Sequence, residues 1–268
     1  MNVLQQGADQ PGTIIFLHIP KTAGLTMVSI LEREYPPDQI FLFRKRANPP
    51  RDRQAFLNES ETFRSQLKLI RGHLAFGIHA DLKQPSTYFT LLRDPVERVV
   101  SHYYYVLQNP THHLYDKVRG MSLSDYVTSG VTREVRNGQT NMVVGMAASE
   151  DSGSDQDRLN QAKENLQQYF SVVGTTERFD ETLILLREAF GWSLPLYSRQ
   201  NVTQNRPQVS SLSAQELAVI RAYNSLDLAL YEYANQLLDQ KIDACPFFGL
   251  KLAYFKLRNR WYNRRSHS

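Results

Sequence analysis

Three short segments of the chain carry residue types that can bind phosphate or accept a proton. The first is "HIPKTAGLT" (residues 18–26), which follows the apolar run "TIIFL" and contains Lys21 and Gly24. A glycine permits a tight turn, and the free N–H groups at a helix start favour a bound phosphate. This segment is interpreted as a phosphate-binding turn between a strand and a helix. A plain turn with a solvated lysine has the same signature.

The order of residues in this turn narrows the kind of phosphate ligand. A Walker A loop, G-x-x-x-x-G-K-[ST], places its lysine after the last glycine, whereas Lys21 here precedes Gly24. The sequence also shows no strand that ends in an obvious magnesium-binding aspartate. We therefore expect a phosphorylated ligand other than a magnesium nucleoside triphosphate.

The second segment is "RDPVERVVSHYYY", which follows the apolar run "STYFTLL". Arg93 stands at the end of this expected strand, and Ser101 lies two turns into a helix whose N-cap is Asp94. A guanidinium group and a hydroxyl together suit a second phosphate. Two other readings stay open: Arg93 pairs with Asp94 or Glu97, and Ser101 is a small residue at a helix contact.

The third segment, "IRGHLAFG", places His73 just after another expected strand. The ordinary pKa of histidine suits the removal of a hydroxyl proton near neutral pH, so His73 is a candidate general base. A buried structural histidine is the alternative. His18 is expected to pack or to orient the first loop, and Glu177 either reaches the site or caps a helix.

Strand-like and helix-like segments alternate along the chain. The expected strands are residues 13–19, 67–73, 86–92 and 171–176, and the main expected helices are residues 26–35, 94–109, 159–170, about 177–190 and 213–241. This alternation predicts an α/β fold with a central parallel sheet flanked by helices, and one domain over residues 1–268. The strand ends of such a sheet meet at one edge, which would bring the three segments together.

The first two segments resemble the two cofactor loops of the carbohydrate sulfotransferases, most closely the group of heparan sulfate 2-O-sulfotransferase and its bacterial relatives. Two later stretches, "VVGTTERFDETLILLREAFGW" and "NGQTNMVVG", are also similar to segments of that family. The resemblance implies a P-loop-like three-layer fold. It also implies transfer of a sulfuryl group from 3′-phosphoadenosine 5′-phosphosulfate (PAPS) to a hydroxyl acceptor, expected to be a glycan or glycoconjugate, without a metal ion.

The resemblance also assigns roles to residues. Lys21 would stabilise the bridging oxygen of the leaving group, Arg93 and Ser101 would hold the 3′-phosphate, and His73 would be the base. The backbone around the 5′-phosphate would come from Thr22, Ala23, Gly24, Leu25 and Thr26. Arg206, in the polar stretch "NVTQNR", is a candidate to close over the nucleotide. The related enzymes have His-Gly-His where this chain has Arg71-Gly72-His73, so one histidine of the pair is missing.

The acceptor is less well marked. Residues 109–138 are long enough to shape an acceptor pocket, and Gln139 and Asn141 either contact the acceptor or satisfy the local backbone. A basic cluster could guide an anionic glycan, but a solvated face is the favoured reading. It comprises Arg44, Lys45, Arg46, Arg51 and Arg53.

Charge is concentrated at the C-terminus. The chain carries a net charge of +4, and residues 251–268 contribute six Lys and Arg and no acid, so the rest is slightly acidic. We therefore expect no nucleic-acid partner. Within a basic amphipathic segment, residues 247–268, four apolar side chains share helical spacing: Leu250, Tyr254, Leu257 and Trp261. This pattern is typical of a membrane-surface contact, of a polyanion contact, or of a terminal helix docked on the domain.

One cysteine, Cys245, excludes an internal disulfide framework. No apolar run approaches the ~20 residues that span a bilayer, and the N-terminus lacks a signal-peptide pattern. These features predict a cytoplasmic location, with peripheral membrane contact through the tail as an option. Two rival functions remain: a P-loop-type small-molecule kinase, which a magnesium requirement would support, and a non-catalytic polyanion-binding protein, which leaves both phosphate segments unexplained.

Overall fold

The computed structural model describes residues 12–44, 49–145, 153–198 and 207–265. In this part of the chain, five parallel strands form one sheet with the order β2-β3-β1-β4-β5. The strands are β1 (Thr13–Leu17), β2 (Ile40–Phe43), β3 (Leu69–Gly72), β4 (Ser86–Leu92) and β5 (Phe170–Thr175). The predicted α/β class with a central parallel sheet is confirmed. The sequence reading missed β2, a four-residue strand too short to show a clear pattern.

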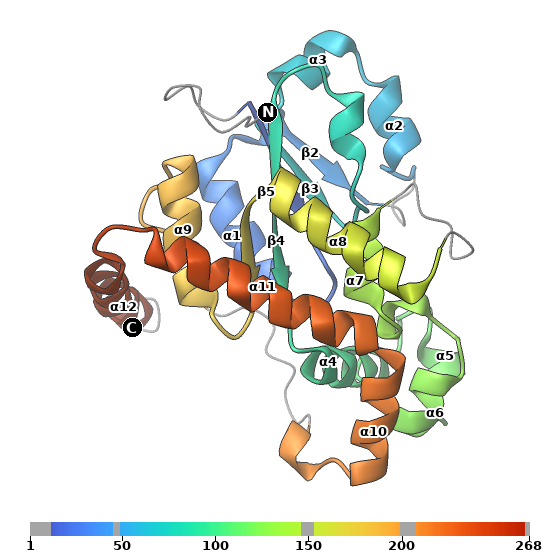
Figure 1. Ribbon diagram of the computed structural model, residues 1–268. Helices are drawn as coiled ribbons and strands as arrows, with labels where there is room; N and C mark the ends of the chain where they lie inside the picture. Colours follow the sequence, from blue (N-terminus) through green and yellow to red (C-terminus); the bar gives the residue numbers. More distant parts are fainter. Residues whose placement is uncertain (1–11, 45–48, 146–152, 199–206, 266–268) are drawn as a thin grey trace.

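Helices cover both faces of this sheet and extend beyond its carboxyl edge (Figure 1). The α-helices are α1 (Gly24–Glu34), α2 (Arg53–Asn58), α3 (Glu61–Gln66), α4 (Pro95–Leu107), α5 (Tyr115–Val118), α6 (Leu123–Thr128), α7 (Gly138–Val144), α8 (Asp155–Tyr169), α9 (Phe179–Phe190), α10 (Ala214–Tyr223), α11 (Ser225–Asp243) and α12 (Phe248–Arg265). The 3₁₀ turns are η1 (Pro37–Gln39), η2 (Ile78–Asp81), η3 (Arg133–Val135) and η4 (Val209–Ser211).

The two faces of the sheet are covered by different helices because side chains alternate along each strand. In β1, Ile15 and Leu17 pack with α7, α8 and α11, and Figure 1 shows α8 and α11 crossing the front of the sheet. Ile14 and Phe16 point the other way and pack with α1, α9 and the first half of α12. The result is a three-layer arrangement in which β1, at the centre of the sheet, is buried on both sides.

A third apolar cluster lies beyond the carboxyl edge of the sheet. It joins α4 to α5, α6, η3 and α10, and its fully buried members include Val99, Tyr126 and Ile220. Residues 109–138 therefore form a small helical lobe on α4 rather than an open loop (Figure 1). This lobe stands over the ends of the strands where the candidate site lies.

The start of α4 follows the sequence prediction in part. The Asp94 carboxylate accepts the Glu97 N–H at 2.9 Å, and Pro95 occupies the first helical turn. A full capping box would also have the Glu97 side chain accept the Asp94 N–H. This contact is not made, because the Asp94 N–H bonds to Glu177 at 3.2 Å and Glu97 pairs with Arg93. These exchanged partners tie the start of α4 to the end of β5.

Candidate functional site

Three neighbouring strands deliver the three predicted segments to one place. β1 lies between β3 and β4, and all run in the same direction, so the residues that follow them meet at the carboxyl edge. Lys21 follows β1, His73 follows β3 and Arg93 follows β4. This edge is where parallel α/β sheets bind their ligands.

The turn between β1 and α1 has a backbone suited to an anion. Lys21 (φ 70°) and Ala23 (φ 61°) both adopt left-handed conformations, which turn successive N–H groups inward. Gly24 begins α1, and a Cβ at this position would fall 1.5 Å from Nε2 of His18, so a side chain here would force the ring or the turn to move. Among the described residues, no side chain caps α1 and no acid lies in its first turn. The start of the helix therefore has no side-chain cap and carries the partial positive charge of the helix dipole.

The threonines of the turn are both buried. The Thr22 hydroxyl donates to the Ile19 carbonyl at 2.8 Å, so it closes the turn from within. Thr26 lies in the first turn of α1, whereas Leu25 between them is exposed. The predicted cofactor loop of residues 22–26 is thus closed by a hydrogen bond of its own.

Arg93 joins the first and second segments directly. Its Nη1 donates to the Lys21 carbonyl at 3.1 Å, and its Nη2 lies 3.2 Å from Oε2 of Glu97. The Lys21 ammonium lies over the ring of Tyr105, 3.9 Å from its centroid. The ion pair of Arg93 with Glu97, one of the alternatives raised from the sequence, is therefore present together with the contact between the loops.

Ser101 lies on the side of α4 that faces this junction. Residues four apart on a helix share a face, and Ser101 stands four residues from both Glu97 and Tyr105. Its side chain is buried. This position suits both the predicted phosphate contact and the alternative of a small residue at a packed face.

His73 is exposed, and one of its nitrogens has a defined partner. Nδ1 lies 2.8 Å from the His18 carbonyl oxygen, which can only accept a hydrogen bond. Nδ1 therefore carries the proton in this contact, and in the neutral ring Nε2 keeps its lone pair. The His18 ring lies 4.3 Å from the His73 ring, centroid to centroid. Burial, and then the nearby charges of His73 and Arg71, hold the pKa of His18 well below its usual range.

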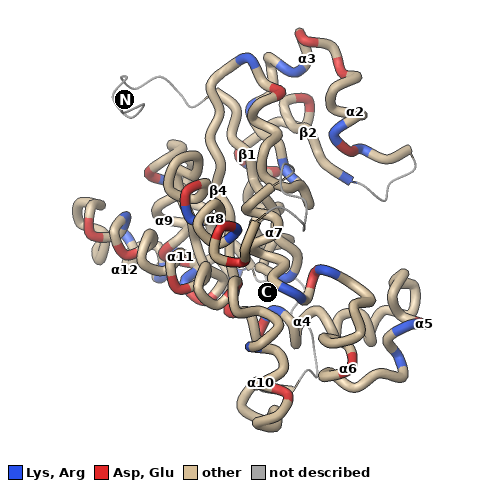
Figure 2. The backbone as a smooth tube through the Cα atoms, turned by 45° about the vertical axis from the view of Figure 1, so that its right-hand side comes forward, with Lys and Arg blue, Asp and Glu red and all other residues tan. Residues whose placement is uncertain are grey.

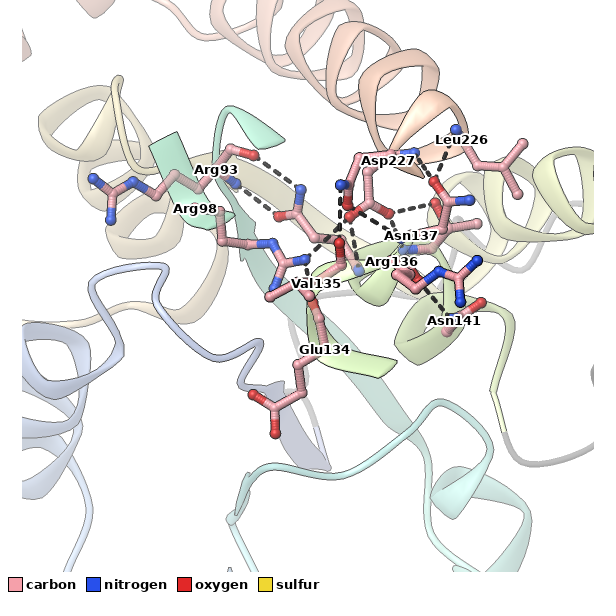
Figure 3. A network of polar contacts seen from close by, with 12 residues as sticks. Arg93, Arg98, Glu134, Val135, Arg136, Asn137, Asn141, Leu226 and Asp227 are labelled. Atoms are coloured by element: carbon pink, nitrogen blue, oxygen red, sulfur yellow. Dashed lines mark hydrogen bonds and ion pairs between the residues drawn. The ribbon is translucent and has the colours of Figure 1, made fainter. Parts of the chain in front are cut away.

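A buried polar network, which the sequence reading missed, supports the second segment (Figure 3). Asp227 of α11 accepts the N–H groups of Gln139 at 3.1 Å and Thr140 at 2.8 Å, and so caps α7 from a distant helix. The Gln139 side chain then bonds both the N–H and the carbonyl of Arg93, each at 2.9 Å. Gln139 therefore satisfies the backbone hydrogen bonds of Arg93. Of the two roles predicted for Gln139, acceptor contact and backbone satisfaction, this is the second.

Arg98 carries this network from α11 to η3. Its guanidinium is almost fully buried, pairs with Asp227 at 3.4 Å and donates to the Glu134 carbonyl at 2.6 Å. Figure 3 shows the Glu134 side chain pointing away from the network. No local sequence pattern predicts that Arg98 contacts Asp227 and the Glu134 carbonyl, because the three residues come from segments far apart in the sequence.

Glu134 places a negative charge near the candidate base. Its carboxylate lies 2.8 Å from Nε2 of His102, whose Nδ1 lies 2.7 Å from the Tyr126 hydroxyl. Burial alone would raise the pKa of Glu134. The hydrogen bond and charge of His102, with the charges of Arg98 and His73, outweigh burial and lower the pKa to about 2. Glu134 is therefore ionised at any working pH.

Several other predicted residues have structural roles. Glu177 accepts the Asp94 N–H and the Tyr231 hydroxyl at 2.9 Å, which corresponds to its predicted capping role. The Asn141 carboxamide bonds to the Arg136 carbonyl at 3.2 Å and to Arg158.

The described part of the basic cluster fits the solvated-face reading. Arg44 and Arg51 pair through their backbones, and Arg53 forms an ion pair with Asp81 at 2.7 Å. Lys45, Arg46 and Arg206 lie outside the described residues.

Comparison with known proteins gives the family. A family model described as galactose-3-O-sulfotransferase matches residues 4–264. The chain belongs to this family. Similar relatives are galactose-3-O-sulfotransferase 3 of Bos taurus (27% identity, 83% of this chain and 56% of the relative) and galactosylceramide sulfotransferase of Mus musculus (27% identity, 86% and 58%). The chain thus spans a little over half the length of the curated relatives it matches.

These comparisons correct two expectations. They support a carbohydrate sulfotransferase family, but not the heparan sulfate 2-O-sulfotransferase group or its bacterial relatives. The prediction of a cytoplasmic location is wrong, because the matched relatives are Golgi-resident, membrane-anchored enzymes. Within the described ranges, no helix combines the length and hydrophobicity of a bilayer crossing.

Proposed function

We propose that this chain transfers a sulfuryl group from PAPS to the 3-hydroxyl of a galactose-containing acceptor, and that residues 1–268 act as one catalytic unit. The observation that carries the proposal is the hydrogen bond from Arg93 to the Lys21 carbonyl, which joins the two loops expected to hold the two phosphates. The family match supports the reaction class, and the names of the relatives support galactose as the sugar.

The residues at the carboxyl edge fit this cofactor. The start of α1, with its left-handed turn, no side-chain cap and no acid in its first turn, would hold the 5′-phosphate through backbone N–H groups. Arg93 and Ser101 would hold the 3′-phosphate, with Arg93 exchanging its contact with Glu97 for the ligand. PAPS supplies a sulfuryl group joined to its 5′-phosphate. Adenosine 3′,5′-bisphosphate is the leaving group when the sulfuryl group is transferred.

Lys21 and His73 would carry the chemistry. The Lys21 ammonium, freed from the ring of Tyr105, would stabilise negative charge on the oxygen that bridges sulfur and phosphorus as that bond to sulfur breaks. Nε2 of His73 would take the proton of the attacking hydroxyl, since Nδ1 is held by the His18 carbonyl. We propose that none of these steps needs a metal ion.

A transfer assay tests the proposal. The chain is incubated with sulfur-labelled PAPS, without magnesium, and with a disaccharide that ends in galactose or its 3-deoxy analogue. We expect label on the first sugar only, and loss of about 10²–10⁴-fold in turnover for His73→Gln. Ser213→Ala, remote from the site, is the matched control. Folded protein that labels neither sugar would overturn the proposal, and equal labelling of both would overturn the choice of hydroxyl.

A further inference from the structure

One helix of the chain keeps a continuous apolar surface in solvent. Five large apolar side chains along α12 and the residue before it are 46–77% exposed: Phe247, Leu250, Tyr254, Leu257 and Trp261. Their spacing of three or four residues places them on one face of the helix. Apart from Leu25 and Tyr105 at the candidate site, these are all the large exposed apolar side chains recorded for the described residues.

The opposite face of α12 is already packed on the domain. Phe248 and Phe255 are buried in the cluster that covers one side of the sheet. The Asn259 side chain accepts the Tyr197 N–H at 2.8 Å, and Asn263 donates to the Tyr197 carbonyl at 3.0 Å. The docked-helix reading of the tail is therefore correct for one face. It leaves the exposed stripe unexplained, because a docked helix needs only one apolar face.

Positive charge borders the stripe on both sides. α12 contains six Lys and Arg and no acid, whereas α11 before it contains four acids and one lysine (Figure 2). Lys256, Arg260 and Arg264 follow each other at intervals of four residues, so they form a row along one border. On the other border, Arg258 and Arg265 lie over the Trp261 ring, 5.7 and 3.6 Å from its centroid.

We propose that α12 is a docking surface for a lipid bilayer with anionic headgroups. The apolar stripe would enter the headgroup region, and the Lys and Arg side chains would reach the phosphates at its sides. Tyr254 and Trp261 suit this position because their rings are apolar with one polar atom. The proposal does not depend on the proposed sulfotransferase function.

The charge pattern favours this occupant over two others. In a symmetric dimer that pairs the stripe with itself, the rows of cations on one copy would face those on the other. A polyanionic chain would pair with the cations but would leave the five apolar side chains in water. A bilayer with acidic lipids satisfies both the stripe and its borders.

Vesicle binding of the full chain tests the proposal. Flotation is measured with vesicles of phosphatidylcholine alone and of phosphatidylcholine with phosphatidylserine. We expect binding to the second kind, weakened at high salt. Trp261 is exposed and the only other tryptophan, Trp192, is buried, so a blue shift of fluorescence on binding reports Trp261. The variant Trp261→Phe should remove the shift.

Two variants decide the outcome, and the second has a charge-matched control. Leu250→Glu with Leu257→Glu alters only exposed positions and should lower vesicle affinity at least about tenfold. Arg258→Glu with Arg260→Glu should do the same, whereas Lys68→Glu with Lys117→Glu, exposed elsewhere, should have little effect. Thermal melts confirm that each variant folds.

Three results would overturn the proposal. One is wild-type chain that binds neither kind of vesicle. Another is the Leu250→Glu, Leu257→Glu variant binding as tightly as the wild type. The third is self-association of the wild-type chain that this variant abolishes, which would assign the stripe to a second copy.

Discussion

Two helices of this chain begin in opposite ways. At the start of α10, the Ser213 hydroxyl accepts the Glu216 N–H at 3.2 Å and the Glu216 carboxylate accepts the Ser213 N–H at 2.9 Å. At the start of α1, among the described residues, no side chain caps the helix and a left-handed alanine precedes Gly24. The local sequence therefore supplies a side-chain cap to the first N–H groups of α10 but none to those of α1. The start of α1 lies at the carboxyl edge of the sheet, where we propose that an anion binds.

Among variants at the start of α1, Lys21→Ala should have the largest effect on turnover. Without the ammonium, charge on the leaving oxygen is unsupported, and turnover should fall by about 10²–10³-fold. Binding of adenosine 3′,5′-bisphosphate should fall much less, because the N–H groups of α1 remain. Steady-state rates and calorimetry on the same preparation measure both effects. Turnover that stays within about twofold of the wild type would remove Lys21 from the chemistry.

Gly24→Ala should act through crowding. A Cβ would meet the His18 ring, so either the turn or the ring must move, at a cost of about 1–3 kcal/mol in stability and a clear loss of ligand affinity. The double variant Gly24→Ala with His18→Ala removes the ring and should recover part of the stability. Urea unfolding of the three proteins measures this, and an undisturbed Gly24→Ala protein would refute the close approach.

The lowered pKa of Glu134 predicts that the stability of the chain depends on pH. Its pKa is lowered from 4.5 to about 2 in the folded chain, so its contribution to stability is complete above about pH 4.5 and is lost as the pH falls toward 2. The stability difference between wild type and Glu134→Gln should therefore shrink over this range. Urea midpoints at several pH values measure it, and a difference independent of pH would contradict the assignment.

The smallest effect is expected where a side chain already caps the helix. Ser213→Ala removes the hydroxyl that accepts the Glu216 N–H, and stability should fall by about 1 kcal/mol. Turnover should not change, because α10 begins far from the carboxyl edge of β1. Thermal melts and turnover rates are measured on one preparation of Ser213→Ala. A larger loss in turnover than in stability would contradict the claim that Ser213 has only a structural role.

Local signals were sufficient to predict much of this fold. Short apolar runs predicted four of the five strands, and Asp94 and Ser213 marked true helix starts. The short strand β2 was missed because four residues carry little pattern. The lysine turn and Arg93 could be placed at the site because strand ends of a parallel sheet meet at one edge.

The rest of the site depends on contacts between distant segments. Asp227 caps α7 from α11, and the Glu134 carboxylate is held by His102 of α4. Neither residue stands out in the sequence, since an isolated acid in a helix or turn is usually a solvated charge. Only the packing of α4, η3 and α11 shows that both are paired and that Asp227 is buried.

Calorimetric titration with adenosine 3′,5′-bisphosphate, without magnesium, tests the central claim that the loops after β1 and β4 form one nucleotide site. The wild type should bind, Arg93→Ala should bind at least about tenfold more weakly, and Ser213→Ala should bind like the wild type. Folded wild-type chain that does not bind, or an Arg93→Ala variant that binds equally well, would contradict the claim.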